Sequence, residues 1–191
     1  RQALPLGGRV ETDYVFEEID ASGEARATPL SALFALPGKS LFVYSFMYAD
    51  DAPPCPMCTS FLDAFDGVAL HAKTQMNLAV VARRSASDLR RFASERGWRH
   101  LRMLSSANNR FNQDYRAESE TGSQIPMITV FRREGDAVHH AYSTELFFAE
   151  NEPGQHPRHV DMVYPLWNLF DFTPEGRPTD WFPQISYGDP V

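Results

Sequence analysis

The sequence predicts an α/β protein built on a mixed β-sheet with helices on both faces. Two observations support this prediction. Apolar runs of strand length alternate with segments of helical periodicity, an order that requires parallel strands joined by right-handed crossovers. A later pair of apolar runs flanks the turn Glu134-Gly135-Asp136 and predicts an antiparallel hairpin in the same sheet. With 191 residues, the chain is long enough to bury the core of one domain.

The first predicted element is a hairpin that starts at residues 14–20 and turns at 21–24. A short helix is expected at 30–35. The continuous apolar and aromatic run at 41–48 is typical of a strand buried on both faces, and it is the best candidate for the centre of the sheet. The remaining predicted elements are a helix from Cys55 to about Lys73, a strand at 76–82, a helix between Ser85 or Ser87 and Gly97, a strand at 100–104, a short helix near 111–115, a hairpin formed by 125–131 and 137–142, and a helix near 161–170.

We expect a single domain over residues 1–191, in three parts. Residues 1–39 form an N-terminal hairpin extension, 40–145 form the core, and 146–191 form an aromatic C-terminal wrap broken by prolines. Aromatic residues at this density pack across a domain or a dimer interface more often than around a cofactor, so a homodimer through this region is one expectation. The residues concerned are Trp167, Phe170, Phe172, Trp181 and Phe182.

Charge and composition exclude several classes of function. The net charge of −7 disfavours a nucleic-acid binder, which needs a basic face to contact phosphates. No apolar run approaches the length of a membrane-spanning helix, and no phosphate-binding glycine loop or hydrolase motif is present. The chain begins at Arg1 rather than Met, so an N-terminal segment can be missing. We expect a cytoplasmic location.

The two cysteines stand as Cys55-Pro56-Met57-Cys58, directly after the predicted central strand and at the start of a helix. Cys55 would occupy the N-cap and Pro56 the first helical position. A thiolate at a helix N-terminus is stabilised by unpaired backbone N–H groups and by the helix dipole. The pattern therefore predicts that Cys55 attacks a disulfide and that the deeper Cys58 resolves the mixed disulfide, a reaction that needs no cofactor.

Other uses of the cysteine pair remain open. A purely structural disulfide would close a loop of only two residues and would add little stability. The Cys-x-x-Cys spacing also suits zinc, and either His156 with His159 or His139 with His140 could complete a four-ligand set. His139 and His140 are adjacent on a predicted strand, so their side chains should point to opposite faces. We expect the loop with His156, Arg158, His159 and Asp161 to serve as a hydrogen-bonded anchor. We expect Asp50 and Asp51 to be solvated loop charges.

A second feature supports the redox interpretation. Ile125-Pro126 begins the late hairpin, at the place where thioredoxins carry a cis-proline that faces the dithiol and docks the substrate. The order of strand, Cys-x-x-Cys, helix, strand, helix, Ile-Pro, hairpin and helix thus resembles the thioredoxin-like fold. The resemblance implies that Pro126 is cis and that Ile125, Pro126 and Pro56 contact a protein or small-molecule disulfide.

The N-terminal hairpin and the long segment before Ile125 resemble the peroxiredoxin arrangement more than minimal thioredoxin. The sequence departs from the peroxiredoxin motif Pro-x-x-x-Thr-x-x-Cys, because Cys55 and Asp51 stand where that motif places threonine and proline relative to Cys58. Over nearly its whole length, the chain also resembles a bacterial family of thioredoxin-like proteins of unknown function. The matching segments are 13–17, 55–67, 96–99, 111–115, 153–159 and 165–168.

The function that the sequence predicts is thiol-disulfide exchange at Cys55 and Cys58. The alternatives are a thiol peroxidase acting through Cys58, a metal-binding module, and a redox-inert scaffold that dimerises through its aromatic tail.

Overall fold

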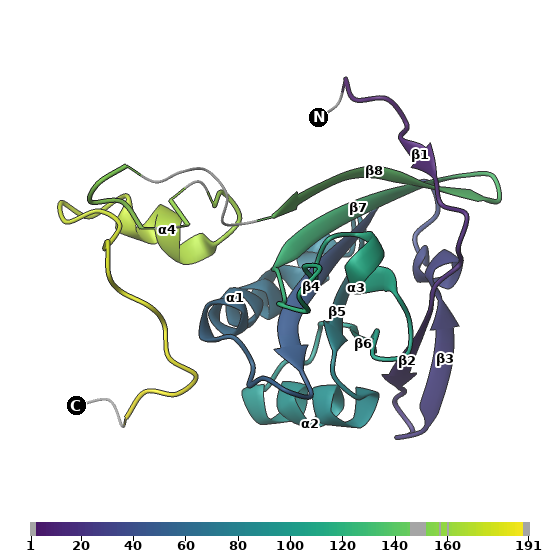
Figure 1. Cartoon of the computed structure of the whole chain (residues 1–191), viewed down its shortest axis with the longest axis horizontal. Helices are drawn as coiled ribbons and strands as arrows, with labels where there is room; N and C mark the ends of the chain where they lie inside the picture. Colours follow the sequence, from purple (N-terminus) through teal and green to yellow (C-terminus); the bar gives the residue numbers. More distant parts are fainter. Residues whose placement is uncertain (1–2, 146–151, 157, 160, 189–191) are drawn as a thin grey trace.

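The computed structural model describes residues 3–145, 152–156, 158–159 and 161–188 of the chain, and its centre is one mixed sheet of eight strands (Figure 1). The strand order is β1-β8-β7-β4-β5-β6-β2-β3. This is the predicted α/β architecture with a thioredoxin-like core. The strands are β1 (Gly8–Arg9), β2 (Val15–Ile19), β3 (Ala25–Pro29), β4 (Leu41–Ala49), β5 (Asn77–Arg83), β6 (Met103–Ser105), β7 (Met127–Glu134) and β8 (Ala137–Glu145).

Strand β4 lies inside the sheet, as its apolar run predicts. It pairs in parallel with β5 and antiparallel with β7. Alternate side chains of β4 enter two separate apolar clusters. Tyr44 and Phe46 belong to one cluster, and Leu41 and Val43 belong to the other. The sheet is therefore packed on both faces, which explains why β4 is apolar throughout rather than alternating with polar residues.

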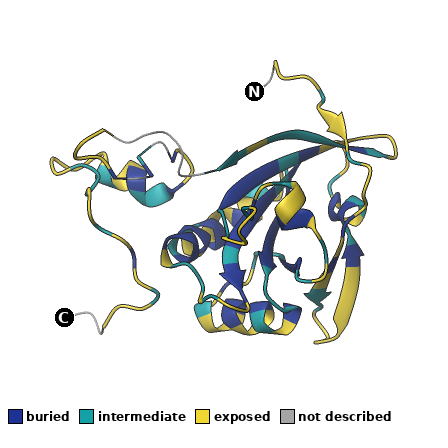
Figure 2. Cartoon of the chain, viewed as in Figure 1, coloured by how far each residue is buried: buried dark blue, intermediate teal, exposed yellow. Residues whose placement is uncertain are grey.

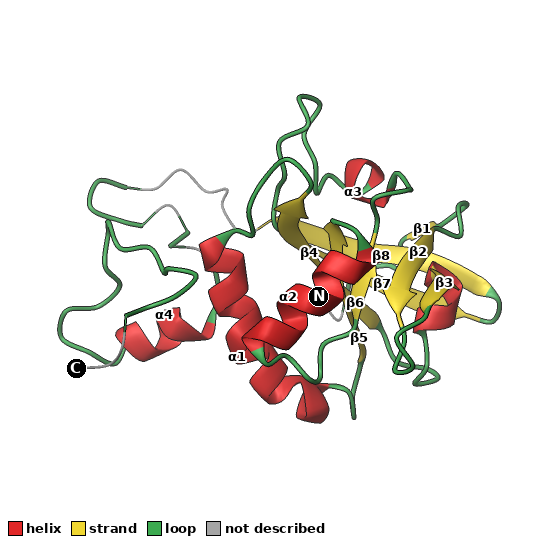
Figure 3. Cartoon of the chain, turned by 90° about the horizontal axis from the view of Figure 1, so that it is seen from below, coloured by secondary structure: helices red, strands yellow, loops and turns green. Residues whose placement is uncertain are grey.

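Helices cover both faces of this sheet, and Figure 3 shows α1 and α2 together on one side and α3 on the other. The first cluster takes side chains from α1 (Pro56–Ala72), α2 (Ala86–Arg96) and α4 (Pro165–Phe170). The second takes side chains from the 3₁₀ helix η1 (Leu30–Leu33) and from α3 (Phe111–Asp114). The ribbon coloured as buried in Figure 2 includes the inner strands and parts of α1 and α2.

Local sequence accounts for the ends of α2. The Ser85 side chain caps the helix by accepting a hydrogen bond from the N–H of Asp88. Gly97 ends the helix in the left-handed conformation, with φ of 77°. Both positions agree with the sequence prediction.

Several elements differ from the prediction. Strand β1 is not predicted, because Gly8 and Arg9 carry no apolar pattern. Strand β6 begins at Met103 rather than His100, because the N–H groups of His100 and Leu101 bind the Asp66 carboxylate instead of a neighbouring strand. The short helix predicted at 30–35 is the 3₁₀ helix Leu30–Leu33. The last helix starts at Pro165 rather than near 161, because the Asp161 side chain accepts two backbone hydrogen bonds in the turn before it.

The C-terminal segment returns to pack against α1, and Figure 3 shows α4 beside that helix. Trp167 and Tyr164 have no exposed surface and lie in the same apolar cluster as Cys58. The Tyr164 hydroxyl and the Ser60 hydroxyl form a hydrogen bond of 2.8 Å. Within the described residues, no helix combines the length and the apolarity that crossing a membrane requires.

Candidate active site

The dithiol is built on the junction between β4 and α1. The Cys55 N–H donates to the Met47 carbonyl of β4 at 3.0 Å. The Cys55 carbonyl accepts hydrogen bonds from both the N–H and the hydroxyl of Thr59, each at 2.9 Å. Cys55 is the N-cap of α1, and Pro56 occupies the first turn. The backbone of Cys55 is therefore fixed on one side by the central strand and on the other by the helix.

The side chain of Cys55 lies beside the backbone N–H groups in the first turn of α1, which have no partner within the helix. Its sulfur accepts a hydrogen bond from the Cys58 N–H at 3.4 Å, and the residue is partly exposed. The pKa of the Cys55 thiol is lowered to about 6. The main cause is a hydrogen bond with the Cys58 side chain, assisted by the N–H groups of Cys58 and Met57 and opposed by partial burial. At neutral pH, Cys55 is thus mainly a thiolate.

Cys58 has the opposite environment. It has no exposed surface, and burial, the hydrogen bond with Cys55 and the charge of Cys55 all raise the pKa of its thiol. The Tyr44 hydroxyl faces this sulfur and partly counteracts the rise in the Cys58 pKa. Cys55 and Cys58 lie close together, at 3.3 Å, and no disulfide joins them in this structure.

A buried cation from the C-terminal segment also acts on the dithiol. Arg158 has no exposed surface, forms an ion pair with Asp161, and lies 5.4 Å from the centre of the Tyr164 ring. Its charge contributes to the lowered pKa of Cys55. The sequence predicts Arg158 as part of a loop anchor, and the ion pair agrees with that role. Its influence on Cys55 is not predicted, because no local pattern links residues about 100 positions apart.

The prediction of a cis-proline requires a correction. The part of the chain that the structure describes contains no cis peptide bond, so the Ile125–Pro126 bond is trans. Pro126 is buried, and Ile125 is tied to the neighbouring loop by a hydrogen bond from its N–H to the Ala117 carbonyl at 2.9 Å. The next residue, Met127, pairs with Ser45 of β4. Pro126 therefore lies toward the carboxyl end of β4, the end that continues to the dithiol.

The other sequence candidates are dispersed. His156 packs against Trp167 and Phe182, and burial lowers its pKa. His139 contacts the Gly7 carbonyl, whereas His140 contacts Ser143 and the rings of Tyr115 and Phe131. Among the described residues, no three His, Cys, Asp or Glu side chains gather as a metal site would need. Asp50 is a largely exposed loop carboxylate that forms an ion pair with Arg84.

Solved structures with the same fold include peroxiredoxins. Oxidised Prx3 from Vibrio vulnificus has 15% sequence identity and a TM-score of 0.55, with 74% of this chain and 88% of that chain covered. Reduced Prx3 from the same organism, in complex with H₂O₂, has 13% identity and a TM-score of 0.53, with 82% and 97% covered. A cysteine-to-serine mutant of peroxiredoxin Q from Xanthomonas campestris has 16% identity and a TM-score of 0.52, with 75% and 86% covered.

At these identities, the likeness concerns the fold alone. No curated protein matches the chain in sequence. A family model matches residues 1–187, and its description is a bacterial protein of unknown function, DUF899. The chain has a peroxiredoxin-like form of the thioredoxin-like fold, and it belongs to the DUF899 family of bacterial proteins of unknown function.

Proposed function

We propose that the protein is a thiol-disulfide oxidoreductase in which Cys55 is the attacking thiolate and Cys58 the resolving thiol. The observation that carries this proposal is the asymmetry of the pair. Cys55 is partly exposed with a pKa lowered to about 6, whereas Cys58 is fully buried with a raised pKa. A nucleophile must be ionised and accessible, while a resolving thiol needs only to reach its neighbour.

The reaction consists of two exchanges. The Cys55 thiolate attacks one sulfur of a substrate disulfide, forming a mixed disulfide and releasing the other substrate sulfur as a thiolate, which takes up a proton. Cys58 then loses its proton and attacks the Cys55 sulfur, which forms the Cys55–Cys58 disulfide and releases the second substrate thiol. The substrate gains two electrons, and the dithiol loses them. An external dithiol returns the protein to its reduced form.

The first exchange prepares the second. The negative charge of Cys55 is one of the causes that raise the pKa of Cys58. Once Cys55 is bound in the mixed disulfide, this charge is gone and the Cys58 proton is lost more readily. The Tyr44 hydroxyl remains beside Cys58 and favours its thiolate. Pro56, which is exposed beside Cys55, and the segment Ile125-Pro126 at the same end of β4 are the proposed contacts for a protein or small-molecule disulfide.

A thiol peroxidase acting through Cys58 is the second candidate, and the observation that favours it is the fold shared with peroxiredoxins. The burial of Cys58 and its raised pKa oppose this assignment, because the thiolate is the form that attacks a peroxide. Mass spectrometry of a Cys55→Ser protein treated with hydrogen peroxide separates the two candidates. Sulfenic acid forming rapidly at Cys58 would favour the peroxidase.

Single cysteine variants test the proposal. We expect Cys58→Ser to accumulate a mixed disulfide with a disulfide-bonded peptide, because its resolving thiol is missing. We expect Cys55→Ser to form none and to lose insulin disulfide reduction by about 1,000-fold or more in the presence of dithiothreitol. The circular dichroism spectrum of each variant checks that its fold is retained. Full turnover by Cys55→Ser, or trapping of the peptide on Cys58, would contradict the assignment.

A further inference from the structure

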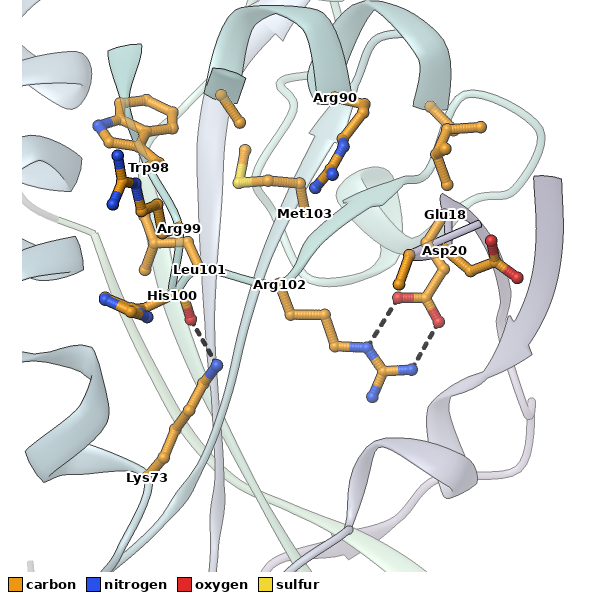
Figure 4. Close-up of a pocket in the computed structure, with 14 residues that line it drawn as sticks. Glu18, Asp20, Lys73, Arg90, Trp98, Arg99, His100, Leu101, Arg102 and Met103 are labelled. Atoms are coloured by element: carbon orange, nitrogen blue, oxygen red, sulfur yellow. Dashed lines mark hydrogen bonds and ion pairs between the residues drawn. The ribbon is translucent and has the colours of Figure 1, made fainter. Parts of the chain in front are cut away.

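A second concave site lies away from the dithiol. It is a cavity of about 400 Å³ bounded by the end of β2, by α2, and by the segment 98–103 that leads into β6 (Figure 4). Lys73, which follows the C-terminus of α1, also lines it. Cys55 stands at the other end of this 17-residue helix, so about 25 Å of helix separates the two sites.

The lining of this cavity is rich in cations although the chain as a whole is acidic. Lys73 contributes to it from the end of α1, Arg90 from α2, and Arg99 and Arg102 from the segment 98–103. Figure 4 shows the Arg90 side chain extending from α2 toward the space beside Arg102. The net charge of the protein is −7, so this positive excess is a local feature of the surface.

The two acidic residues of the lining already accept hydrogen bonds from other parts of the protein. Both Glu18 carboxylate oxygens accept hydrogen bonds from Arg102, from its Nε at 2.8 Å and its Nη2 at 2.6 Å. The Asp20 carboxylate accepts hydrogen bonds from the N–H groups of Ser22 and Glu24 in the same turn, at 2.8 and 3.1 Å. Neither carboxylate is therefore placed to neutralise the other cations.

The remaining cations lack an acidic hydrogen-bond partner. Within the described part of the chain, Arg90 and Arg99 form no hydrogen bond or ion pair with another residue. Lys73 donates to the His100 carbonyl, which carries no net charge. Burial lowers the pKa of Lys73; the charge of Asp66 opposes this effect, and the smaller effect of the Arg102 charge adds to it. A bound anion would favour the charged forms of the cations that line the cavity.

We propose that this cavity binds a small anion with at least two negative charges, of the phosphate-ester or polycarboxylate kind, which Arg90 and Arg99 contact from opposite walls of the cavity. The volume lies in the range of small-molecule sites. Guanidinium groups present paired N–H donors that match phosphate and carboxylate oxygens. Arg102, fixed by Glu18, forms a rigid wall of the site. The proposal is independent of the dithiol chemistry, so a Cys55→Ser protein binds the anion equally well.

Isothermal titration of the whole protein with inorganic pyrophosphate, and separately with citrate, tests this proposal at constant ionic strength. We expect saturable binding of at least one of the two anions. The variants Arg90→Gln and Arg99→Gln should each weaken it by about tenfold, because each removes charge-assisted hydrogen bonds. Both side chains are exposed, so the fold should tolerate the changes.

Arg91→Gln is the matched control. Arg91 is the next residue on α2 and pairs with Asp88 and Glu95 outside the cavity. Its substitution removes the same charge and should leave the anion affinity within about twofold of the original protein. The proposal fails if the original protein binds neither anion, or if Arg91→Gln weakens binding as much as Arg90→Gln does.

Discussion

At the scale of single residues, two identical side chains acquire different chemistry within one helical turn. Cys55 caps the first turn of α1 and accepts its N–H groups, whereas Cys58 lies one turn deeper, beside Tyr44 and without exposed surface. The cap position lowers one thiol pKa, and burial raises the other. The order of the proposed reaction follows from this difference, because only one of the two sulfurs is both ionised and reachable from solvent.

The pH dependence of alkylation follows from the lowered pKa of Cys55. The thiolate fraction is half at about pH 6 and nearly complete at neutral pH. The rate of iodoacetamide modification should therefore rise through about pH 6 and level off above pH 7.5, whereas an ordinary cysteine keeps gaining reactivity up to about pH 9. Peptide mass spectrometry at short reaction times gives the rate at each site. Cys58 in a Cys55→Ser protein is the control and should stay unmodified until the protein unfolds.

At the scale of elements, strand β1 shows how a close approach of two backbones selects a residue. Gly7 precedes β1 with φ of 97°, and a Cβ added there would lie 1.9 Å from the His140 carbonyl oxygen of β8. A Cβ added at Gly8 would meet no atom within 4 Å, and Gly8 does not have a left-handed φ. β1 itself pairs with β8 over only two residues. Its attachment therefore depends on a glycine at position 7.

Exchanging these two glycines for alanine tests that dependence. We expect Gly7→Ala to lower the free energy of unfolding by about 1 kcal/mol or more, because of the clash and the left-handed conformation. It should also speed hydrogen exchange at the Val10 N–H, which donates to the Val138 carbonyl. Gly8→Ala should leave both quantities nearly unchanged. Similar values for the two variants, from denaturant titration and exchange, would show that the close approach is not important.

At the scale of the whole molecule, the C-terminal segment is part of the folded core and not an appended tail. Trp167 has no exposed surface and packs in the cluster that contains Cys58, and Tyr164 joins the segment to α1 through Ser60. Phe172, five residues later, is 91% exposed. The predicted aromatic wrap thus has an inner and an outer side. Dimerisation through its outer side remains a prediction.

The stabilities of the Trp167→Ala and Phe172→Ala variants should distinguish the buried side of this segment from its exposed side. Removing the Trp167 indole leaves a large cavity in the core, and we expect a loss of about 3 kcal/mol in the free energy of unfolding. Phe172→Ala should change stability by less than about 0.5 kcal/mol, because its ring contributes little buried area. Denaturant titrations monitored by circular dichroism provide both values. Equal stability of the two variants would mean that the segment does not pack against α1 in solution.

Local sequence is enough to predict much of the fold and the position of the two cysteines in the candidate site. The apolar run at 41–48, the capping residues of α2 and the Cys-Pro-x-Cys pattern each act within a few neighbouring residues, so their consequences can be predicted from the chain. The prediction of a cis Pro126 failed because it came from a family resemblance. The intrinsic preference between the two isomers is only about 1 kcal/mol, too little for the sequence to fix the isomer.

The local pattern of the chain is therefore enough to place a cysteine pair after a buried strand at the start of a helix. The charges and hydroxyls that surround this pair depend on how distant parts of the chain pack together. Tyr44 and Arg158 act on the cysteines from a neighbouring strand and from the C-terminal segment. Arg90, Arg99 and Lys73 likewise line one cavity although they come from different elements of the chain. Electrostatic interactions depend on distance through space, and a linear sequence does not contain that distance until the chain has folded.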